Sequence, residues 1–148
     1  MNKIQLKERC IAVILERMDG LHKAMKQAQD AANNETKSSS GDKYETGRAM
    51  NQLDKDMYAR QLAENSKELA AIMETNCDEL SVTAGIGSFI KCDGASFFII
   101  AGLGKLDYEG ETIFIISPNA PLARSMQGKK KGESFVFNNR QLTILEIY

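Results

Sequence analysis

The fold of the chain is decided by the stretch IQLKERCIAVILERMDGLHKAMKQAQDAA, residues 4–32. Its apolar side chains recur at alternating spacings of three and four, which places them in one row along an α-helix. This row, here called the seam, is interrupted once, by Lys7; its members are Ile4, Lys7, Ile11, Ile14, Met18, Leu21, Met25, Ala28 and Ala32. The seam predicts a helix about 45 Å long that packs on a partner helix, most closely where its side chains shrink to alanine.

A second helix is expected from about residue 44 to 76, after the polar, turn-forming segment NNETKSSSGD at 33–42. Its apolar positions change register between Met57 and Leu62, as a stutter would produce. These positions are Met50, Leu53, Met57, Leu62, Leu69, Ile72 and Met73. Two seams joined by a short polar link predict an antiparallel coiled-coil hairpin over residues 1–76, with its tip near 34–46. A parallel coiled-coil dimer is the alternative, but the central break argues against it, and we expect a monomer.

Residues 80–148 are expected to form a β-rich domain, because the composition changes near residue 77. Both prolines and most glycines follow that point, with short runs of β-branched and aromatic residues. Asp93-Gly94 and Asn138-Asn139 predict hairpin turns, and the apolar run at 111–117 predicts a central strand. Pro121 and Gly128 mark the start and stop of a short helix within 118–128. The predicted fold class is α+β: a helical hairpin, then an antiparallel sheet wrapped on one short helix.

Composition and charge exclude several classes of protein. A net charge of −1 creates no overall attraction to nucleic acid or to an anionic membrane. No apolar run approaches the ~20 residues that span a bilayer, and the N-terminus lacks the apolar core of a signal peptide, so a cytoplasmic protein is expected. Three scattered cysteines and the single histidine, His22, offer neither zinc-ligand spacing nor a Cys-His catalytic pair. The thiols are therefore expected to be free.

Two segments resemble motifs of the Gre family of bacterial transcript-cleavage factors. Gly41-Asp42-Lys43-Tyr44-Glu45 is similar to the G-D-x-x-E of the family's hairpin tip. The signature segment, SPNAPLARSMQGK at 117–129, is similar to the family's C-terminal motif S-x-x-S/A-P-L/I-G/A-R-x-L/M-x-G-K, through Ser117, Pro121, Leu122, Arg124, Gly128 and Lys129. The resemblance implies an FKBP-like C-terminal domain that grips the rim of the RNA polymerase secondary channel through these residues. It also implies that the hairpin enters the channel and approaches the 3′ end of the nascent RNA.

The same resemblance implies a chemical role for Asp42 and Glu45 at the tip. The two carboxylates would meet the catalytic Mg²⁺ of a backtracked polymerase, with Asp42 as metal ligand and Glu45 positioning or deprotonating water. Phosphodiester hydrolysis with two metal ions needs such oxygen ligands for the second, loosely held ion. The chain would then be a cofactor of the polymerase active site and not itself an enzyme, and alone it would carry no cofactor. D-x-x-E before a helix is also a capping box, which remains the alternative.

Three other functions remain open from the sequence. A channel-binding regulator of the same architecture would not stimulate cleavage, and Lys37, Lys43 and three serines make this tip less acidic than many Gre tips. An FKBP-like prolyl isomerase would use Phe97 or Phe98 in an aromatic pocket, although adjacent strand residues face opposite ways and one should be core. A chaperone-like clamp would need apolar tips, whereas this tip is polar.

Overall fold

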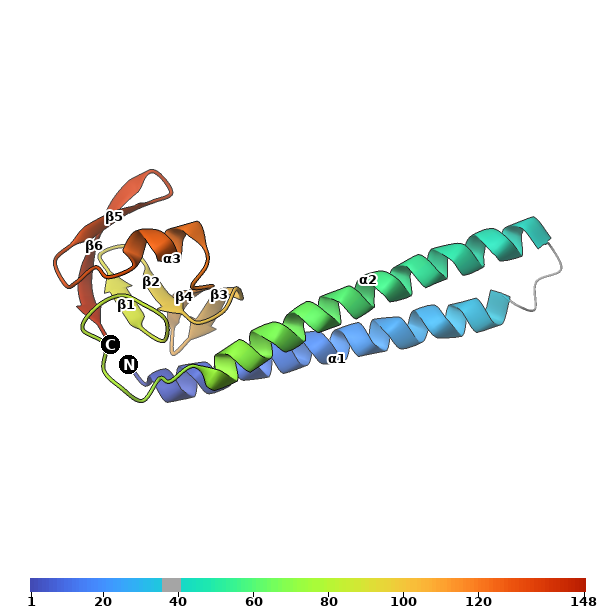
Figure 1. Ribbon diagram of the computed structural model, residues 1–148, viewed down its shortest axis with the longest axis horizontal. Helices are drawn as coiled ribbons and strands as arrows, with labels where there is room; N and C mark the ends of the chain where they lie inside the picture. The colour runs from blue at the N-terminus through green and yellow to red at the C-terminus, as the bar shows by residue number, and fades with distance from the viewer. Residues whose placement is uncertain (36–40) are drawn as a thin grey trace. The chain divides into compact units, whose positions relative to one another are not determined.

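The computed structural model describes the backbone of residues 1–35 and 41–148, and the side chains of residues 1–34 and 45–148. These residues form two compact units, one made of Met1–Ala12 with Glu68–Tyr148 and the other of Val13–Lys67. The predicted α+β class is confirmed, because two long helices precede a six-stranded sheet and a short helix (Figure 1). Within the described ranges, no helix is both long enough and apolar enough to cross a membrane.

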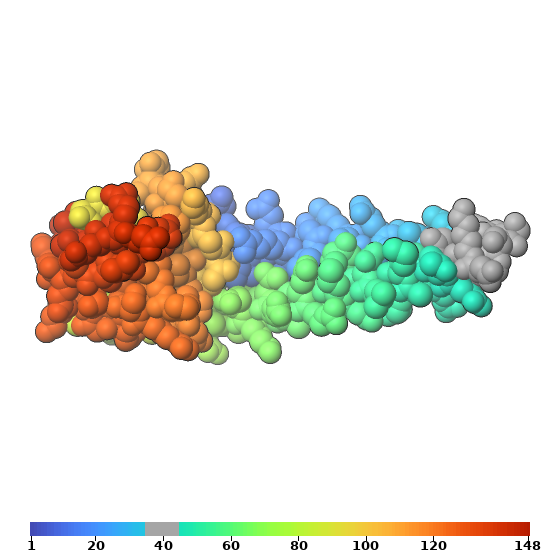
Figure 2. All heavy atoms as spheres, turned by 90° about the horizontal axis from the view of Figure 1, so that it is seen from above, coloured from blue at the N-terminus to red at the C-terminus, as the bar shows by residue number. Residues whose placement is uncertain are grey.

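Helix α1 spans Lys3–Glu35 and helix α2 spans Gly41–Glu74. Over the unit Val13–Lys67 the two run alongside each other in opposite directions, as both views show (Figure 1, Figure 2). The middle of α1 follows the predicted seam, with Ile14 buried and the next five seam positions partly buried. The predicted antiparallel pairing of the helices is therefore present.

The first turns of α1 bury a different face from the one predicted. Ile4 is exposed, whereas Leu6 and Cys10 are completely buried. These turns belong to the unit that contains the sheet, so their buried face is not set by the partner helix alone. The hydroxyl of Tyr108, on the strand β3 defined below, donates to Gln5 Oε1 at 3.2 Å and ties the β-rich part to this helix end.

The predicted register of α2 is wrong between residues 50 and 58. Met50, Leu53 and Met57 are 62%, 67% and 37% exposed, so they do not face α1. One row of partly or fully buried positions alternates at spacings of four and three without a stutter, with Glu68 partly buried beside it; the row is Asn51, Lys55, Tyr58, Leu62, Asn65, Leu69 and Ile72. The inward face of α2 is therefore regular but polar toward the tip.

The small side chains of α1 explain how polar residues fit into this seam. Near the tip the seam of α1 consists of Ala28 and Ala32, which leave room for the apolar stem of a longer side chain. The ammonium of Lys55 crosses to α1 and donates to Gln29 Oε1 at 2.7 Å. Because the polar group has a partner, Lys55 can occupy an inward position without an unmet hydrogen bond.

The β-rich part contains one sheet with the strand order β3-β4-β2-β1-β6-β5. All neighbours are antiparallel except β2 and β4, which pair in parallel, so the expected antiparallel sheet is mostly but not wholly antiparallel. Strand β3 was not expected from the sequence, whereas the central place of the 111–117 run is confirmed. The elements are β1 (Phe89–Cys92), β2 (Ser96–Ile99), β3 (Gly104–Tyr108), β4 (Glu111–Ile116), α3 (Pro121–Met126), β5 (Ser134–Phe137) and β6 (Arg140–Ile147).

Both predicted hairpin turns are present. Strands β1 and β2 pair across the turn that contains Asp93 and Gly94. Strands β5 and β6 pair across Asn138 and Asn139, whose φ angles of 51° and 59° are those of a type I′ turn. Asparagine tolerates this left-handed backbone better than most residues, which explains why two of them stand here.

Phe97 lies at the centre of the core between the sheet and α3. Its side chain is fully buried and contacts the rings of Phe114, Phe135 and Phe137 at centroid distances of 5.5, 5.7 and 5.3 Å. Ala123 and Met126 of α3 are buried in the same cluster. The short helix is therefore held to the sheet mainly by apolar contact.

The thiols are free, as predicted, and all three are buried. Burial raises the pKa of Cys10 to about 12 and that of Cys92 to about 12. The pKa of Cys77 is also raised, mainly by burial, although nearby lysines oppose the shift. Because the thiolate is the reactive form, none of these groups is arranged as a nucleophile.

Removing the Phe97 ring should destabilise the C-terminal domain strongly. Phe97→Ala is expected to lower the free energy of unfolding by about 3–5 kcal/mol, because it leaves a cavity among three rings. Urea denaturation followed by circular dichroism measures this. Val136→Ala, at a position 65% exposed on strand β5, is the control and should change stability by less than about 0.5 kcal/mol. Equal losses in the two variants would contradict the central place of Phe97.

The folded protein should resist alkylation of its thiols. At pH 8, thiols with a pKa near 12 hold almost no thiolate, so iodoacetamide should label none of them in the time that it labels glutathione. In urea all three should react, as intact mass spectrometry would show. Val136→Cys places a thiol on an exposed position and should react in the folded state. Rapid native labelling of Cys10, Cys77 or Cys92 would show that the described burial is wrong.

Candidate functional site

The two tip carboxylates fall in the first turn of α2. The helix spans Gly41–Glu74, so Asp42 and Glu45 are its second and fifth residues, three apart in sequence. The side chain of Asp42 lies outside the described residues. Glu45 is exposed, and its carboxylate is the type of ligand that Mg²⁺ prefers. Glu45, the member of the pair whose side chain is described, therefore offers a carboxylate of the kind that a Mg²⁺ ion would require.

The first residue of α2 can be compared with the position that a capping box requires. A capping box places its first member at the N-cap, immediately before the first helical residue. Asp42 instead follows the first helical residue, Gly41. Because assigned helix ends vary by one or two residues, a cap and a carboxylate pair both remain interpretations of Asp42 and Glu45.

Glu45 borders a shallow, open hollow on the surface of α2. Arg48, Ala49 and Gln52 also line it. Arg48 is three residues from Glu45, so its guanidinium partly offsets the negative charge of the tip. Among the side chains that the structure describes, no three His, Cys, Asp or Glu groups gather closely enough to hold a metal ion.

The first part of the signature segment builds the turn into α3. The Ser117 hydroxyl accepts a hydrogen bond from the Asn119 N–H at 3.2 Å, and the Ser117 carbonyl accepts one from the Ala120 N–H at 3.0 Å. Pro121 is the first residue of α3, as predicted, where its missing N–H leaves no bond unmet. Ser117 and Pro121 thus have local structural roles.

The end of the signature segment fastens α3 to the chain that follows the hairpin. The Gly128 N–H donates to the Ala84 carbonyl at 2.8 Å, and the Ala84 N–H donates to the Lys129 carbonyl at 2.8 Å. Gly128 has a φ of 76°, which strains any residue with a Cβ. The predicted glycine stop is therefore required by the backbone.

Leu122 and Arg124 differ in what they can offer a partner. Leu122 is partly buried and packs on the core cluster around Phe97, so a change there would disturb the fold as well as a surface. Arg124 is exposed near the end of the same helix. Of the signature residues proposed to bind a partner, Arg124 is the charged side chain that is exposed on α3.

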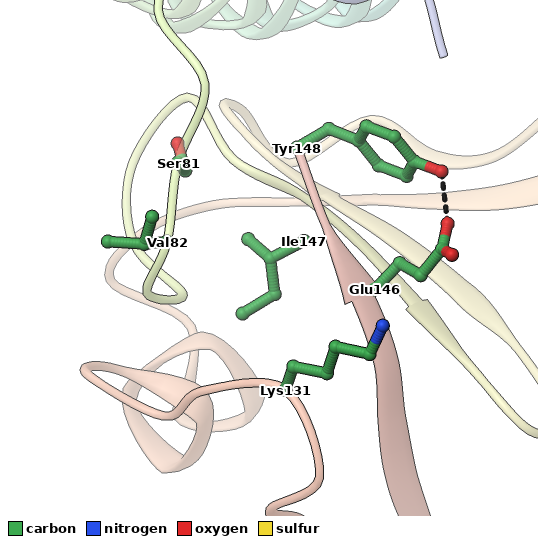
Figure 3. A pocket seen from close by; sticks show the side chains of 6 residues that line it. All are labelled: Ser81, Val82, Lys131, Glu146, Ile147 and Tyr148. Atoms are coloured by element: carbon green, nitrogen blue, oxygen red, sulfur yellow. Dashed lines mark hydrogen bonds between the residues drawn. The ribbon is translucent and has the colours of Figure 1, made fainter.

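The structure also contains a groove that was not predicted from the sequence. It lies between the loop after α2, the turn after α3 and the end of β6, and is lined by Ser81, Val82, Lys131, Glu146, Ile147 and Tyr148 (Figure 3). Val82 is 81% exposed, and the Tyr148 hydroxyl donates to Glu146. This hydrogen bond raises the pKa of Tyr148 and lowers that of Glu146. The groove joins residues far apart in sequence, so no local pattern could have signalled it.

The aromatic residues considered for an isomerase pocket are both inside the protein. Phe97 and Phe98 are completely buried. They face opposite sides of the sheet, because only Phe97 belongs to the cluster that packs on α3. Neither ring can line an open proline-binding pocket in this conformation.

Comparisons with known proteins do not extend this description. No protein-family model matches the chain, and no curated protein matches it either. The likeness of the tip and the signature segment to Gre motifs thus remains a prediction from the sequence, and function has to be inferred from these residues themselves.

Proposed function

We propose that the chain is an RNA polymerase elongation factor that enters the secondary channel and stimulates cleavage of backtracked RNA. The observation that carries this proposal is the placement of Asp42 and Glu45 in the first turn of α2, at the turn end of an antiparallel helix pair. A hairpin of this kind can carry carboxylates along a narrow passage to an active site that is not its own. The C-terminal domain would hold the rim of the channel.

The chemistry proposed for the tip requires two oxygen ligands on one helix face. When bound in the polymerase, a second Mg²⁺ would supply the activated water for phosphodiester hydrolysis. Asp42 would hold the ion, and Glu45 would orient the water or accept its proton. Because both residues belong to the first turn of one helix, a single element would carry the two ligands together.

A regulator that occupies the channel without promoting cleavage is the second candidate. Arg48 lies on the same hollow as Glu45 and lowers the net negative charge there. Weaker charge at the tip would weaken recruitment of a second cation. The two candidates share a binding partner and differ only in chemistry, so one assay on stalled elongation complexes separates them.

Neutralising the tip should abolish stimulation without harming the fold. Asp42→Asn is expected to reduce stimulated cleavage about tenfold or more, because a neutral amide is a poorer Mg²⁺ ligand than a carboxylate. Glu45→Gln should also impair cleavage. Melting temperature and polymerase affinity should stay close to those of the parent, and high Mg²⁺ should partly restore cleavage by Asp42→Asn.

Asp54→Asn is the matched control for the tip variants. Asp54 is an exposed acid on the same helix but lies three turns away, so its loss should leave cleavage unchanged. If both tip variants stimulate cleavage like the parent, the carboxylates are not catalytic. If the parent binds polymerase without releasing 3′ RNA fragments, the channel-binding regulator is the correct function.

Binding should depend on Arg124. Arg124→Ala is expected to weaken polymerase affinity about fivefold or more, because it removes an exposed charge from the proposed grip while the buried face of α3 is kept. Surface plasmon resonance on the core enzyme measures this at two salt concentrations. Ser125→Ala, at the neighbouring exposed position, is the control. Normal affinity of Arg124→Ala at low salt would place the grip elsewhere.

A further inference from the structure

The groove at the end of β6, here called the β6 groove, has a volume of about 430 Å³ and is open to solvent (Figure 3). Val82 and Ile147 supply its apolar surface, and Val82 is 81% exposed. Sites for small molecules have volumes of roughly 300–1,000 Å³ but enclose most of the ligand, which an open groove cannot do. The shape therefore suits a segment of a larger molecule that lies across the groove.

Backbone hydrogen bonds hold both apolar walls in place. Ala84, two residues after Val82, donates its N–H to the Lys129 carbonyl at 2.8 Å. At the other wall, the Tyr148 N–H donates to the Phe89 carbonyl at 2.9 Å, and the Phe89 N–H donates to the Tyr148 carbonyl at 3.1 Å. Because the backbone of both walls is already ordered, a ligand would not have to order it on binding.

Lys131 supplies the positive charge of the β6 groove. It is exposed, and in the described part of the chain its ammonium donates no hydrogen bond. Lys129 and Lys130 precede it directly in the turn after α3. The nearest acid in sequence, Glu133, uses a carboxylate oxygen to accept the Lys130 backbone N–H at 2.6 Å. Three successive lysines therefore border the groove on this side.

The acid that lines the groove, Glu146, is already engaged by its own chain. Its carboxylate accepts a hydrogen bond from the Tyr148 hydroxyl, and its strand position is paired with that of Lys91 on β1. The pKa of Glu146 is lowered, chiefly by that hydrogen bond and also by the charges of Lys131 and Lys91. Because Lys91 offsets Glu146, the positive charge of Lys131 and its two neighbours is left for a ligand.

The acids at the start of the same loop do not cancel this charge. Asp78 and Glu79 lie close enough to the Lys3 ammonium to act on its pKa, and neither lines the β6 groove. Lys3 also donates to the Glu79 carbonyl at 2.6 Å, which ties this part of the loop to α1. The groove thus combines an apolar surface with an excess of positive charge.

An acidic protein segment is the ligand whose chemistry matches this combination. Nucleic acids are held by several lysines or arginines along a strip of phosphates, whereas here apolar side chains and Glu146 line the groove beside Lys131. We propose that the β6 groove binds an acidic segment of a partner protein, with an apolar side chain against Val82 and Ile147 and a carboxylate at Lys131. Such a segment can belong to any protein, so this site is independent of the proposed function.

Selection from a library of short random peptides tests which chemistry the groove prefers. Phage that display the library are selected on the immobilised full chain, and the Kd of each enriched peptide is then measured by fluorescence anisotropy. We expect enriched peptides to combine Asp or Glu with a large apolar side chain. If no peptide is enriched, or if the enriched peptides are basic or lack acids, the proposal is overturned.

Variants of the groove show whether these peptides bind there. Val82→Ser and Lys131→Glu should each raise Kd about tenfold or more, because one removes apolar contact and the other reverses the charge. Val136→Ser and Lys67→Glu make the same changes at exposed positions outside the groove and should bind like the parent. All four variants should keep the melting temperature of the parent, since each position is exposed. Unchanged Kd values in Val82→Ser and Lys131→Glu would rule out binding in the groove.

Competition with single-stranded oligouridylate distinguishes an acidic protein segment from nucleic acid. At physiological ionic strength the oligonucleotide should not displace a labelled peptide, because one short lysine turn makes few phosphate contacts. Displacement at oligonucleotide concentrations close to the Kd of the peptide would identify phosphate as an equal or better ligand and would overturn the proposal.

Discussion

Two lysines of α1 fix the point at which the chain leaves the hairpin. Lys7 Nζ donates to the carbonyls of Met73 and Thr75 at 3.1 and 2.8 Å, and these are among the groups that the end of α2 leaves without helical partners. Lys3 Nζ donates to the Glu79 carbonyl at 2.6 Å and to that of Gly87 at 3.3 Å. A cation at a helix C-terminus also opposes the negative end of the helix dipole. These four hydrogen bonds join the first turns of α1 to the end of α2 and to the loop that leads into the sheet.

The elements that the sequence predicted correctly are those set by local chemistry. Pro121, the Asp93-Gly94 turn and the Asn138-Asn139 turn act within a few residues, and each lies where it was expected. The register of α2 was predicted wrongly because apolar periodicity assumes that apolar residues face inward. Here Lys55 finds its partner on the other helix, and that contact cannot be read from one helix alone.

Strand β3 is another element that local sequence patterns do not predict. Its sequence, GKLDY, has only one aliphatic side chain and does not alternate strongly, so its extended form depends on pairing with β4. The parallel pairing of β2 with β4 is likewise long-range, because it requires the intervening β3 to lie on the outer side of β4. At the candidate site, the tip motif could be located from spacing, whereas the groove at Val82 depends on three separate segments meeting.

The two Gre-like motifs differ in how much they say about function. Most of the signature segment is used to build and fasten α3, through Ser117, Pro121 and Gly128, so a protein could keep this motif for its fold alone. At the tip, the described member of the carboxylate pair, Glu45, is exposed and borders a shallow hollow on α2. A hairpin with a polar seam gains less from its own burial than one with Met50 and Met57 turned inward. The observed register instead keeps the hydrogen bond from Lys55 to Gln29, so a polar contact across the hairpin takes the place of additional apolar burial.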